Sequence, residues 1–308
     1  MTKIRESSLT RFARLAYAAA KASLPAYSHA KSPHRYTLPQ LAACVLVGMH
    51  EKKSYRDTEQ LLLASDEIRT ALELHDEVPN YATLSRTFKK ISASDWERMN
   101  TNLLLAFNEG AGVEEAYVAI DSTYFAPTQA SSTFLTKAGR KRARYFTGAF
   151  AVGTESQFIL AVCSGMGPGS DVPYLKPLRK KALRFGIQRP SGRRYQTVLA
   201  DKGFDGRTVR EGDLIPVIRR GNALRNPTLI ARAELVAQAR LDGKMGQRWK
   251  VETVNSVIKR MFGEHIRSRS DDLRTREPFV KALVYNLHVL FAFFQTAFFA
   301  SQQARFAA

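Results

Sequence analysis

Two aspartates in this sequence each follow a short apolar run that is typical of a buried strand. Asp121 follows residues 117–120, and Asp201 follows residues 196–200. Taken singly, either residue could cap a strand end or form a turn. If the two runs are strands of one sheet, however, the carboxylates can meet, and they then need a cation because they repel each other. Mg²⁺ accepts one or two protein carboxylates together with water and phosphate oxygens. The pair therefore predicts a divalent-metal site.

A third acid for such a site lies in a segment that is predicted to be helical, residues 247–263. At about 100° per residue, Glu252 shares one stripe with Arg248 and Lys259, because both cations fall within about 40° of it. Apolar side chains gather on the opposite side, namely Val251, Val254, Val257, Ile258 and Met261. The helix could thus pack on a sheet and present one carboxylate between two cations. The alternative is an ordinary surface pair of Arg248 and Glu252, which contributes only about 0.3–0.5 kcal/mol.

The charge balance indicates a polyanionic partner. The chain has 47 Lys and Arg against 28 Asp and Glu, which gives a formal charge of +19. Nucleic acid is the commonest partner of such a chain, and an anionic membrane surface is the alternative. Residues 137–194 alone hold thirteen Lys and Arg against two acids, Glu155 and Asp171. This concentration predicts a DNA-binding face, with four candidate contacts close together in the chain: Arg140, Lys141, Arg142 and Arg144.

The cysteines and the N-terminal segment say little about chemistry. Cys44 and Cys163 lie in apolar runs, so we expect core thiols in a reducing cytoplasm. Residues 1–36 form a basic N-terminal arm with some of the composition of a transit peptide, but Glu6 interrupts it and no cleavage site is evident. A basic helix or a mobile arm is expected there.

Residues 37–110 are expected to form an α-helical DNA-binding region. Two capping-box patterns mark helix starts within it: Ser54 with Asp57, and Ser94 with Glu97. A short helix beginning at residues 79–80 would carry polar and basic side chains, as the recognition helix of a helix-turn-helix does: Thr83, Arg86, Lys89 and Lys90. Arg86 and Lys89 are therefore candidate DNA contacts, and a basic helix that is merely solvated is the alternative.

Residues 111–295 have the pattern of a mixed α/β domain. Strands are expected at five runs: residues 117–120, 145–152, 158–164, 196–200 and 214–218. Helical stretches are expected after the third and fourth of these, with Asp205 as the cap of the second helix. The order predicts a mixed sheet flanked by helices. The apolar run 283–300 approaches membrane-span length, but its Asn286, His288 and Gln295 favour a helix buried against protein. Residues 296–308 are left as a tail.

The order Asp121, Asp201, Arg248-x3-Glu252-x6-Lys259 resembles the DDE transposases of bacterial insertion sequences, whose catalytic domain has a ribonuclease H-like fold. The resemblance covers residues 35–292 and includes the basic helix near residue 80 and the run at 280–290. It implies that Asp121, Asp201 and Glu252 bind two Mg²⁺ or Mn²⁺ ions, and that Arg248 and Lys259 contact transposon-end DNA.

The resemblance also implies a reaction. Two metal ions would activate water to hydrolyse a phosphodiester at the element's end, and the freed 3′-hydroxyl would attack target DNA. A homodimer on double-stranded DNA, in the cytoplasm and nucleoid of a bacterium and with no membrane partner, follows from the same family. Two departures concern the handling of the cut end. Met245 stands where many relatives have tyrosine, and only 50 residues (202–251) separate Asp201 from Glu252, where some relatives carry a large β insertion.

Three other functions stay open at this point. A related metal-dependent nuclease would cut without strand transfer. A DNA-binding protein would carry the three acids as vestiges, which the intact set of acids with its Arg and Lys disfavours. A membrane-associated basic protein would use the C-terminal apolar run. The terminal repeats and the target sequence are not encoded in these residues.

Overall fold

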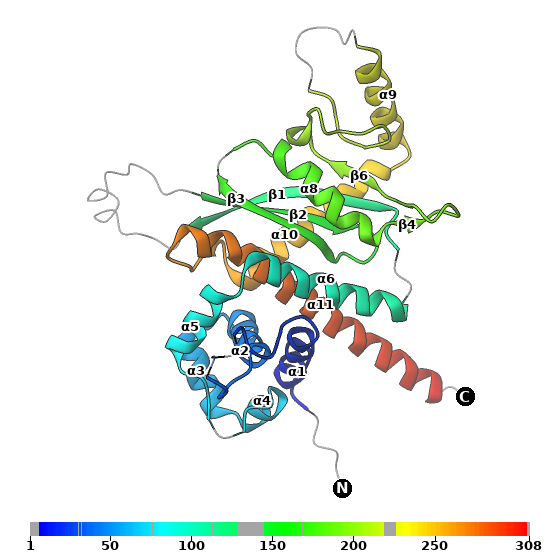
Figure 1. The fold of residues 1–308 in the computed structure, drawn as a ribbon. Coiled ribbons are helices and arrows are strands. Elements are labelled where there is room, and N and C mark those ends of the chain that lie inside the picture. Colours follow the sequence, from blue (N-terminus) through cyan, green and yellow to red (C-terminus); the bar gives the residue numbers. More distant parts are fainter. Residues whose placement is uncertain are drawn as a thin grey trace, which may run out of the picture. The chain divides into compact units, whose positions relative to one another are not determined.

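The computed structural model describes residues 6–29, 31, 33–75, 77–111, 114–127, 145–167, 169–218 and 226–306. The chain forms two compact units (Figure 1). One consists of Met1–Leu103 together with Val280–Ala308, and the other of Leu104–Phe279. The first is helical and the second contains the sheet, in agreement with the predicted helical N-terminal region and mixed α/β domain.

The helical unit contains five complete helices among its described residues: α1 (Ser8–Lys21), α2 (Leu38–His50), α3 (Tyr55–Ala64), α4 (Asp66–Ala71) and α5 (Tyr81–Lys90). It also holds the first part of α6 (Ala93–Ala111) and most of α11 (Asp271–Phe306). Helix α1, which lies in the predicted N-terminal arm, packs against α2 and α4 and buries Phe12 and Ala16. Among the described residues, no helix is long and apolar enough to cross a membrane.

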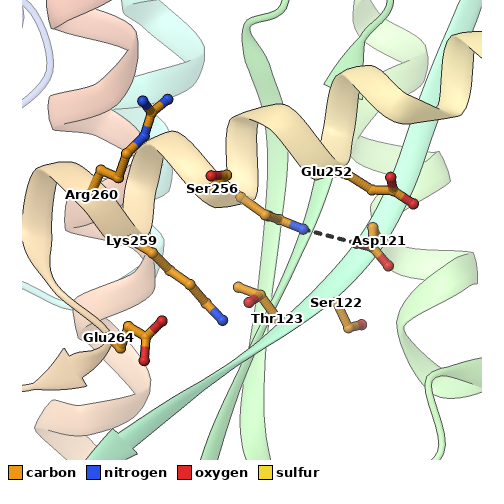
Figure 2. Close-up of a pocket in the computed structure, with 9 residues that line it drawn as sticks. Asp121, Ser122, Thr123, Glu252, Ser256, Lys259, Arg260 and Glu264 are labelled. Atoms are coloured by element: carbon orange, nitrogen blue, oxygen red, sulfur yellow. Dashed lines mark hydrogen bonds between the residues drawn. The ribbon is translucent and has the colours of Figure 1, made fainter.

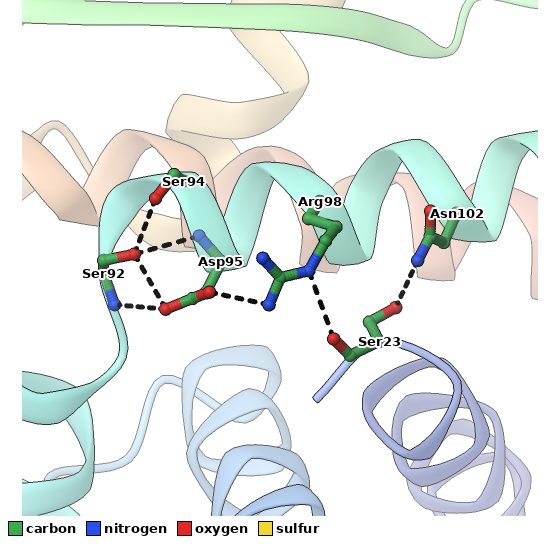
Figure 3. Close-up of polar contacts among 6 residues, drawn as sticks. All are labelled: Ser23, Ser92, Ser94, Asp95, Arg98 and Asn102. Atoms are coloured by element: carbon green, nitrogen blue, oxygen red, sulfur yellow. Dashed lines mark hydrogen bonds and ion pairs between the residues drawn. The ribbon is translucent and has the colours of Figure 1, made fainter. Parts of the chain in front are cut away.

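Side-chain caps set where these helices begin. The predicted capping box at Ser54 and Asp57 is confirmed at the start of α3. Helix α6 begins two residues earlier than its predicted box requires, because Ser92 and Asp95 form the reciprocal bonds instead of Ser94 and Glu97 (Figure 3). The amide of Ser92 donates to Asp95 Oδ2 at 3.1 Å, and the amide of Asp95 donates to Ser92 Oγ at 3.1 Å.

The second unit is built on a sheet with the order β3-β2-β1-β6. Its four main strands are β1 (Tyr117–Pro127), β2 (Tyr145–Gly153), β3 (Ile159–Gly167) and β6 (Thr197–Ala200). β1, β2 and β3 form an antiparallel meander, whereas β6 runs parallel to β1. β7 (His265–Ile266) pairs with the end of β1, and β4 (Ile187–Gln188) pairs with β5 (Arg194–Tyr195) in a separate ribbon. This mixed sheet with flanking helices agrees with a ribonuclease H-like fold.

Two helices pack on the sheet, with α8 (Val172–Ala182) in front of it and α10 (Trp249–Phe262) behind it in Figure 1. The α10 side chains that were predicted to face a sheet are buried at Val251, Val254 and Ile258. The remaining elements are short 3₁₀ turns and one longer helix: η1 (Leu183–Phe185), η2 (Lys202–Phe204), α9 (Pro227–Leu241) and η3 (Lys244–Arg248).

The segment after β6 differs from the prediction. Residues 206–213 form turns rather than a helix, so Asp205 does not cap a following helix; its carboxylate accepts from the amide of Ile218 at 2.7 Å and pairs with Arg232 of α9. The expected strand at 214–218 is reduced to a single bridge between Leu214 and Leu199. Pro216 explains this result, because proline has no N–H to donate to a strand ladder.

Candidate active site

The two aspartates follow directly after paired residues of two neighbouring parallel strands. β1 and β6 are parallel and pair from Tyr117 with Thr197 to Ile120 with Ala200, so Asp121 and Asp201 occupy the next position of each chain. β6 ends at that point, whereas β1 continues to Pro127 by pairing first with β2 and then with β7. Asp121 is therefore an interior residue of a strand and not its end, and the register places it and Asp201 at corresponding backbone positions, while the metal site that the pair predicted stays a prediction.

Asp121 is a half-buried carboxylate in an acidic setting. Its pKa is raised to about 6, mainly by burial; the carboxylates of Asp201 and Glu252 contribute to this rise, and the amide of Ser122 and the charge of Arg248 oppose it. The side-chain amide of Asn255 donates to Asp121 Oδ2 at 2.9 Å. The charges of Asp201, Arg248 and Glu252 thus all act on Asp121, although the three acids come from separate parts of the chain.

A pocket of about 420 Å³ lies beside Asp121, between β1 and α10. In Figure 2, Glu252 and Lys259 project from α10 towards the strand that carries Asp121 and Thr123. The residues that line the pocket are Asp121, Ser122, Thr123, Glu252, Asn255, Ser256, Lys259, Arg260 and Glu264. The predicted stripe of α10 is thus realised for Glu252 and Lys259, which face the same cavity.

Arg248 occupies a different place from Lys259. It forms an i,i+4 ion pair with Glu252 at 2.5 Å, and the Glu252 side chain is 51% exposed. This is the surface pair that the helical spacing allowed, and an exposed pair of this kind contributes little to stability. Arg248 nevertheless lies close enough to Asp121 to lower its pKa. The carboxylate of Glu252 is therefore held by Arg248 at the rim of the pocket.

Asp201 is held by the backbone that follows it. Its Oδ1 accepts from the amide of Gly203 at 2.8 Å, in the first turn of η2. A side chain at position 203 would collide with this arrangement, because a Cβ there would lie 2.9 Å from Asp201 Oδ1 and 3.3 Å from Asp171 Oδ2. Gly203 thus allows two carboxylates to approach the same stretch of backbone.

Asp171 is an acid of this site that sequence reasoning missed. It precedes α8, and burial raises its pKa, with a further contribution from Asp201, while the Ser122 hydroxyl opposes the rise. Its Oδ1 is buried and has no hydrogen-bond partner among the described residues. In the sequence it stood only as one of two acids within a basic stretch. The one usable signal was that it follows a strand and precedes a helix, as Asp201 does.

Asn255 is the second residue that was missed. It is 6% exposed and comes three residues after Glu252, which places it within about 60° of the Glu252 stripe of the helix. That spacing was available in the sequence, but an amide between a valine and a serine carries no chemical signal of its own. Its contact with Asp121 depends on how α10 packs on β1.

The chemistry of the site fits a divalent cation. Half-buried carboxylate oxygens, one of them an orphaned atom of Asp171, are the hard donors that Mg²⁺ and Mn²⁺ prefer. Within the described part of the chain, no three His, Cys, Asp or Glu side chains stand close enough together to hold an ion. Glu252 is one reason, because its carboxylate is turned to Arg248. The carboxylates are therefore of the right chemical type for a divalent cation and lie near one another, but Glu252 is paired with Arg248.

The predicted DNA contacts have different outcomes. Arg86 and Lys89 are exposed on α5, whose N-cap is Asn80 as expected. Arg140, Lys141, Arg142 and Arg144 lie outside the described residues. The basic stretch 137–194 is not one surface, because Arg179 is buried, donates to the carbonyl of Thr208 at 2.8 Å and pairs with Asp213. This arginine supports the interior of the sheet unit.

A mixed α/β unit with adjacent acids on parallel strands, and with a cationic helix beside them, is suited to chemistry on phosphate groups. A family model of the transposase DDE domain matches residues 114–287, which is more than half of the chain. The chain therefore belongs to this family of DDE transposases. The family implies DNA as the partner, and its members generally use divalent metal ions. Comparisons with curated proteins and with solved structures give no match.

Proposed function

We propose that this chain is the transposase of a bacterial insertion sequence, which hydrolyses a phosphodiester at each end of its element and then joins the freed 3′-hydroxyl to target DNA. The observation that carries the proposal is the register of β1 and β6, which brings Asp121 next to Asp201. The pocket beside them adds Glu252 and Lys259 from one face of α10.

In this proposal Asp121, Asp201 and Glu252 hold two Mg²⁺ or Mn²⁺ ions. When bound, such ions polarise the phosphate and favour ionisation of the attacking hydroxyl. Asp121 is fixed by its pairing with Phe150 of β2, and Asp201 is fixed by the Gly203 amide. Glu252 joins them by exchanging its contact with Arg248, which is an inexpensive change for an exposed pair.

The two cations of α10 act on the DNA phosphate. Lys259 lines the pocket that contains Asp121 and Glu252, so its ammonium group lies where a scissile phosphate would carry developing negative charge. Arg248, once released from Glu252, offers a guanidinium group at the rim, which suits a phosphate oxygen pair. Both side chains are proposed to stabilise the transition state of cleavage, and to contribute little to the stability of the helix.

General DNA affinity comes from the positive surface. Arg86 and Lys89 on α5 are proposed to contact the transposon end, and Arg140, Lys141, Arg142 and Arg144 its backbone. The active form is proposed to be a homodimer that pairs two ends of the element, working on DNA in the bacterial cytoplasm. A net charge of +19 supports binding to double-stranded DNA as a whole, because phosphate contacts dominate such affinity.

The test uses the three acids one at a time. Asp121→Asn, Asp201→Asn and Glu252→Gln should each abolish cleavage of the element's ends and leave DNA binding largely intact, since a metal ligand is lost while the basic surface remains. The substrate comes from the genomic DNA that flanks the reading frame, where matched inverted repeats bounded by short direct repeats are expected. Glu211→Gln, an exposed acid of the same unit, is the control and should cleave normally.

Three outcomes decide between this proposal and its rivals. Cleavage by the wild type at its normal rate in EDTA would contradict metal dependence. Cleavage without joining, when ends that are already cut are supplied with target DNA, would reduce the protein to a nuclease. Metal-dependent nicking by the wild type would exclude a DNA-binding protein with vestigial acids.

A further inference from the structure

Asn255 is a buried amide whose orientation is fixed by its neighbour. Its Nδ2 lies 2.9 Å from Asp121 Oδ2, and the residue is 6% exposed. The hydrogen bond is drawn as the dashed line that ends on Asp121 in Figure 2. A carboxylate oxygen in contact with an amide must accept, so the NH₂ group faces Asp121 and the amide oxygen faces away.

The other end of this amide has no role in the fold. Among the described residues, Asn255 Oδ1 is buried without a hydrogen-bond partner. A buried acceptor with no partner destabilises a protein, and a leucine of similar size would fill the position without that cost. Packing alone therefore does not account for an asparagine here. The hydrogen bond that the amide makes with a described side chain is the one to Asp121.

An amide is the suitable group for directing a carboxylate towards a cation. It donates a hydrogen bond but carries no charge, so it orients Asp121 without neutralising it as a lysine or arginine would. It cannot transfer its proton to the carboxylate. Donors that orient a metal-binding carboxylate in this way typically account for a factor of about 10–100 in metal affinity or activity.

We propose that Asn255 is a positioning residue that fixes the carboxylate of Asp121 for binding a divalent cation. The inference rests on the proposed function, because it takes Asp121 as a metal ligand. In this role Asn255 is not itself a ligand of the cation; it acts through one oxygen of Asp121. It belongs to α10, the helix that also carries Glu252, so one helix supplies an acid of the set and holds another in place.

The experiment measures cation binding directly. Asn255→Leu keeps the volume and removes both ends of the amide, whereas Asn255→Ala removes the amide and leaves a cavity. Mn²⁺ binding to the full-length protein is followed by the electron paramagnetic resonance signal of free Mn²⁺, and the melting temperature is recorded without divalent cations. The matched control is Thr253→Ala, on the same helix and outside the pocket lining.

We expect the Mn²⁺ dissociation constant to rise about 10–100-fold in both Asn255 variants and to stay at the wild-type value in Thr253→Ala. The melting temperature of Asn255→Leu should stay close to that of the wild type, because removal of the buried unpaired oxygen offsets loss of the hydrogen bond to Asp121. Cleavage at low Mn²⁺ should be lost and should recover at high Mn²⁺, which a packing defect would not produce. A rise in the Mn²⁺ dissociation constant that Asn255→Leu and Asn255→Ala share is caused by loss of the amide, because the leucine keeps the packing and the alanine does not.

The failures are distinguishable. If Asp121→Asn abolishes Mn²⁺ binding while both Asn255 variants bind as the wild type does, the positioning role is wrong and the proposed function stands. If wild type and Asp121→Asn bind Mn²⁺ equally or not at all, the proposed function itself fails. Loss of folded protein in both Asn255 variants would make Asn255 a packing residue and overturn the inference.

Discussion

Asp121→Asn should make the cation-free protein more stable while it destroys activity. The carboxylate is half-buried among other acids, and burial is the first cause of its raised pKa. Asparagine has the same shape and no charge, and its amide oxygen can still accept the hydrogen bond from Asn255 Nδ2. The substitution thus removes an unfavourable charge without opening a cavity.

The magnitude follows from the pKa. A rise from 3.8 to about 6 corresponds to about 3 kcal/mol, at 1.36 kcal/mol for each step of one in pKa. Because the folded-state pKa is raised, the folded protein holds the proton more tightly than the unfolded chain does. The cost of Asp121 is therefore absent below about pH 4, grows between pH 4 and pH 6, and is complete above that range. For a unit of this size, 3 kcal/mol corresponds to about 6–12 °C in melting temperature.

The assay is differential scanning calorimetry in EDTA at pH 4 and at pH 8. The variant should melt well above the wild type at pH 8 and close to it at pH 4. Glu211→Gln, which removes an exposed acid from the same unit, should follow the wild type at both pH values. Mg²⁺ should raise the melting temperature of the wild type alone, because a ligand stabilises the state that binds it. An equal gap at the two pH values would refute the view that Asp121 is a costly buried charge.

Other substitutions test the remaining cations and the DNA surface. Lys259→Ala should lower single-turnover cleavage at saturating DNA by at least about tenfold, or about 1.4 kcal/mol in the barrier, with a melting temperature within a few degrees of wild type. Arg248→Ala should show the same split, since its exposed pair with Glu252 adds little stability; wild-type rates in both would make the helix face a solvated surface. A further variant replaces four basic residues together, namely Arg140, Lys141, Arg142 and Arg144. The log-log salt dependence of its DNA binding should flatten by about 0.9 per lost phosphate contact, and an unchanged slope would show that these side chains do not touch the DNA backbone.

The centre of the fold could be predicted because its signals are local. Runs of apolar residues gave the strands around Asp121 and Asp201, and the helical period of residues 247–263 placed Glu252 and Lys259 on one face. The end of β1, by contrast, is not set by a local signal. Residues beyond Asp121 are polar or aromatic, and they remain in the strand because they pair with β2, whose residues Phe146–Phe150 lie far along the chain.

Errors in the prediction arose where two local patterns competed. Ser92 with Asp95 and Ser94 with Glu97 both have capping-box spacing, and only the packing of α6 decides between them. Asp205 had the position of a helix cap, but the backbone of Ile218 and the side chain of Arg232 provide it with better partners. Both outcomes depend on contacts between elements that a helix or turn propensity does not contain.

Each acid of the proposed set has its own donor in the structure, and the donors differ in kind. Asp121 accepts from the amide of Asn255, and Asp201 accepts from the backbone amide of Gly203. These neutral donors hold an orientation and leave the negative charge available, so they can persist when a cation arrives. Glu252 is paired with a full cation, Arg248, in an exposed position where the pair contributes little to stability. The two aspartates are therefore preset by the sheet, and Glu252 is the carboxylate that can change partner at low cost.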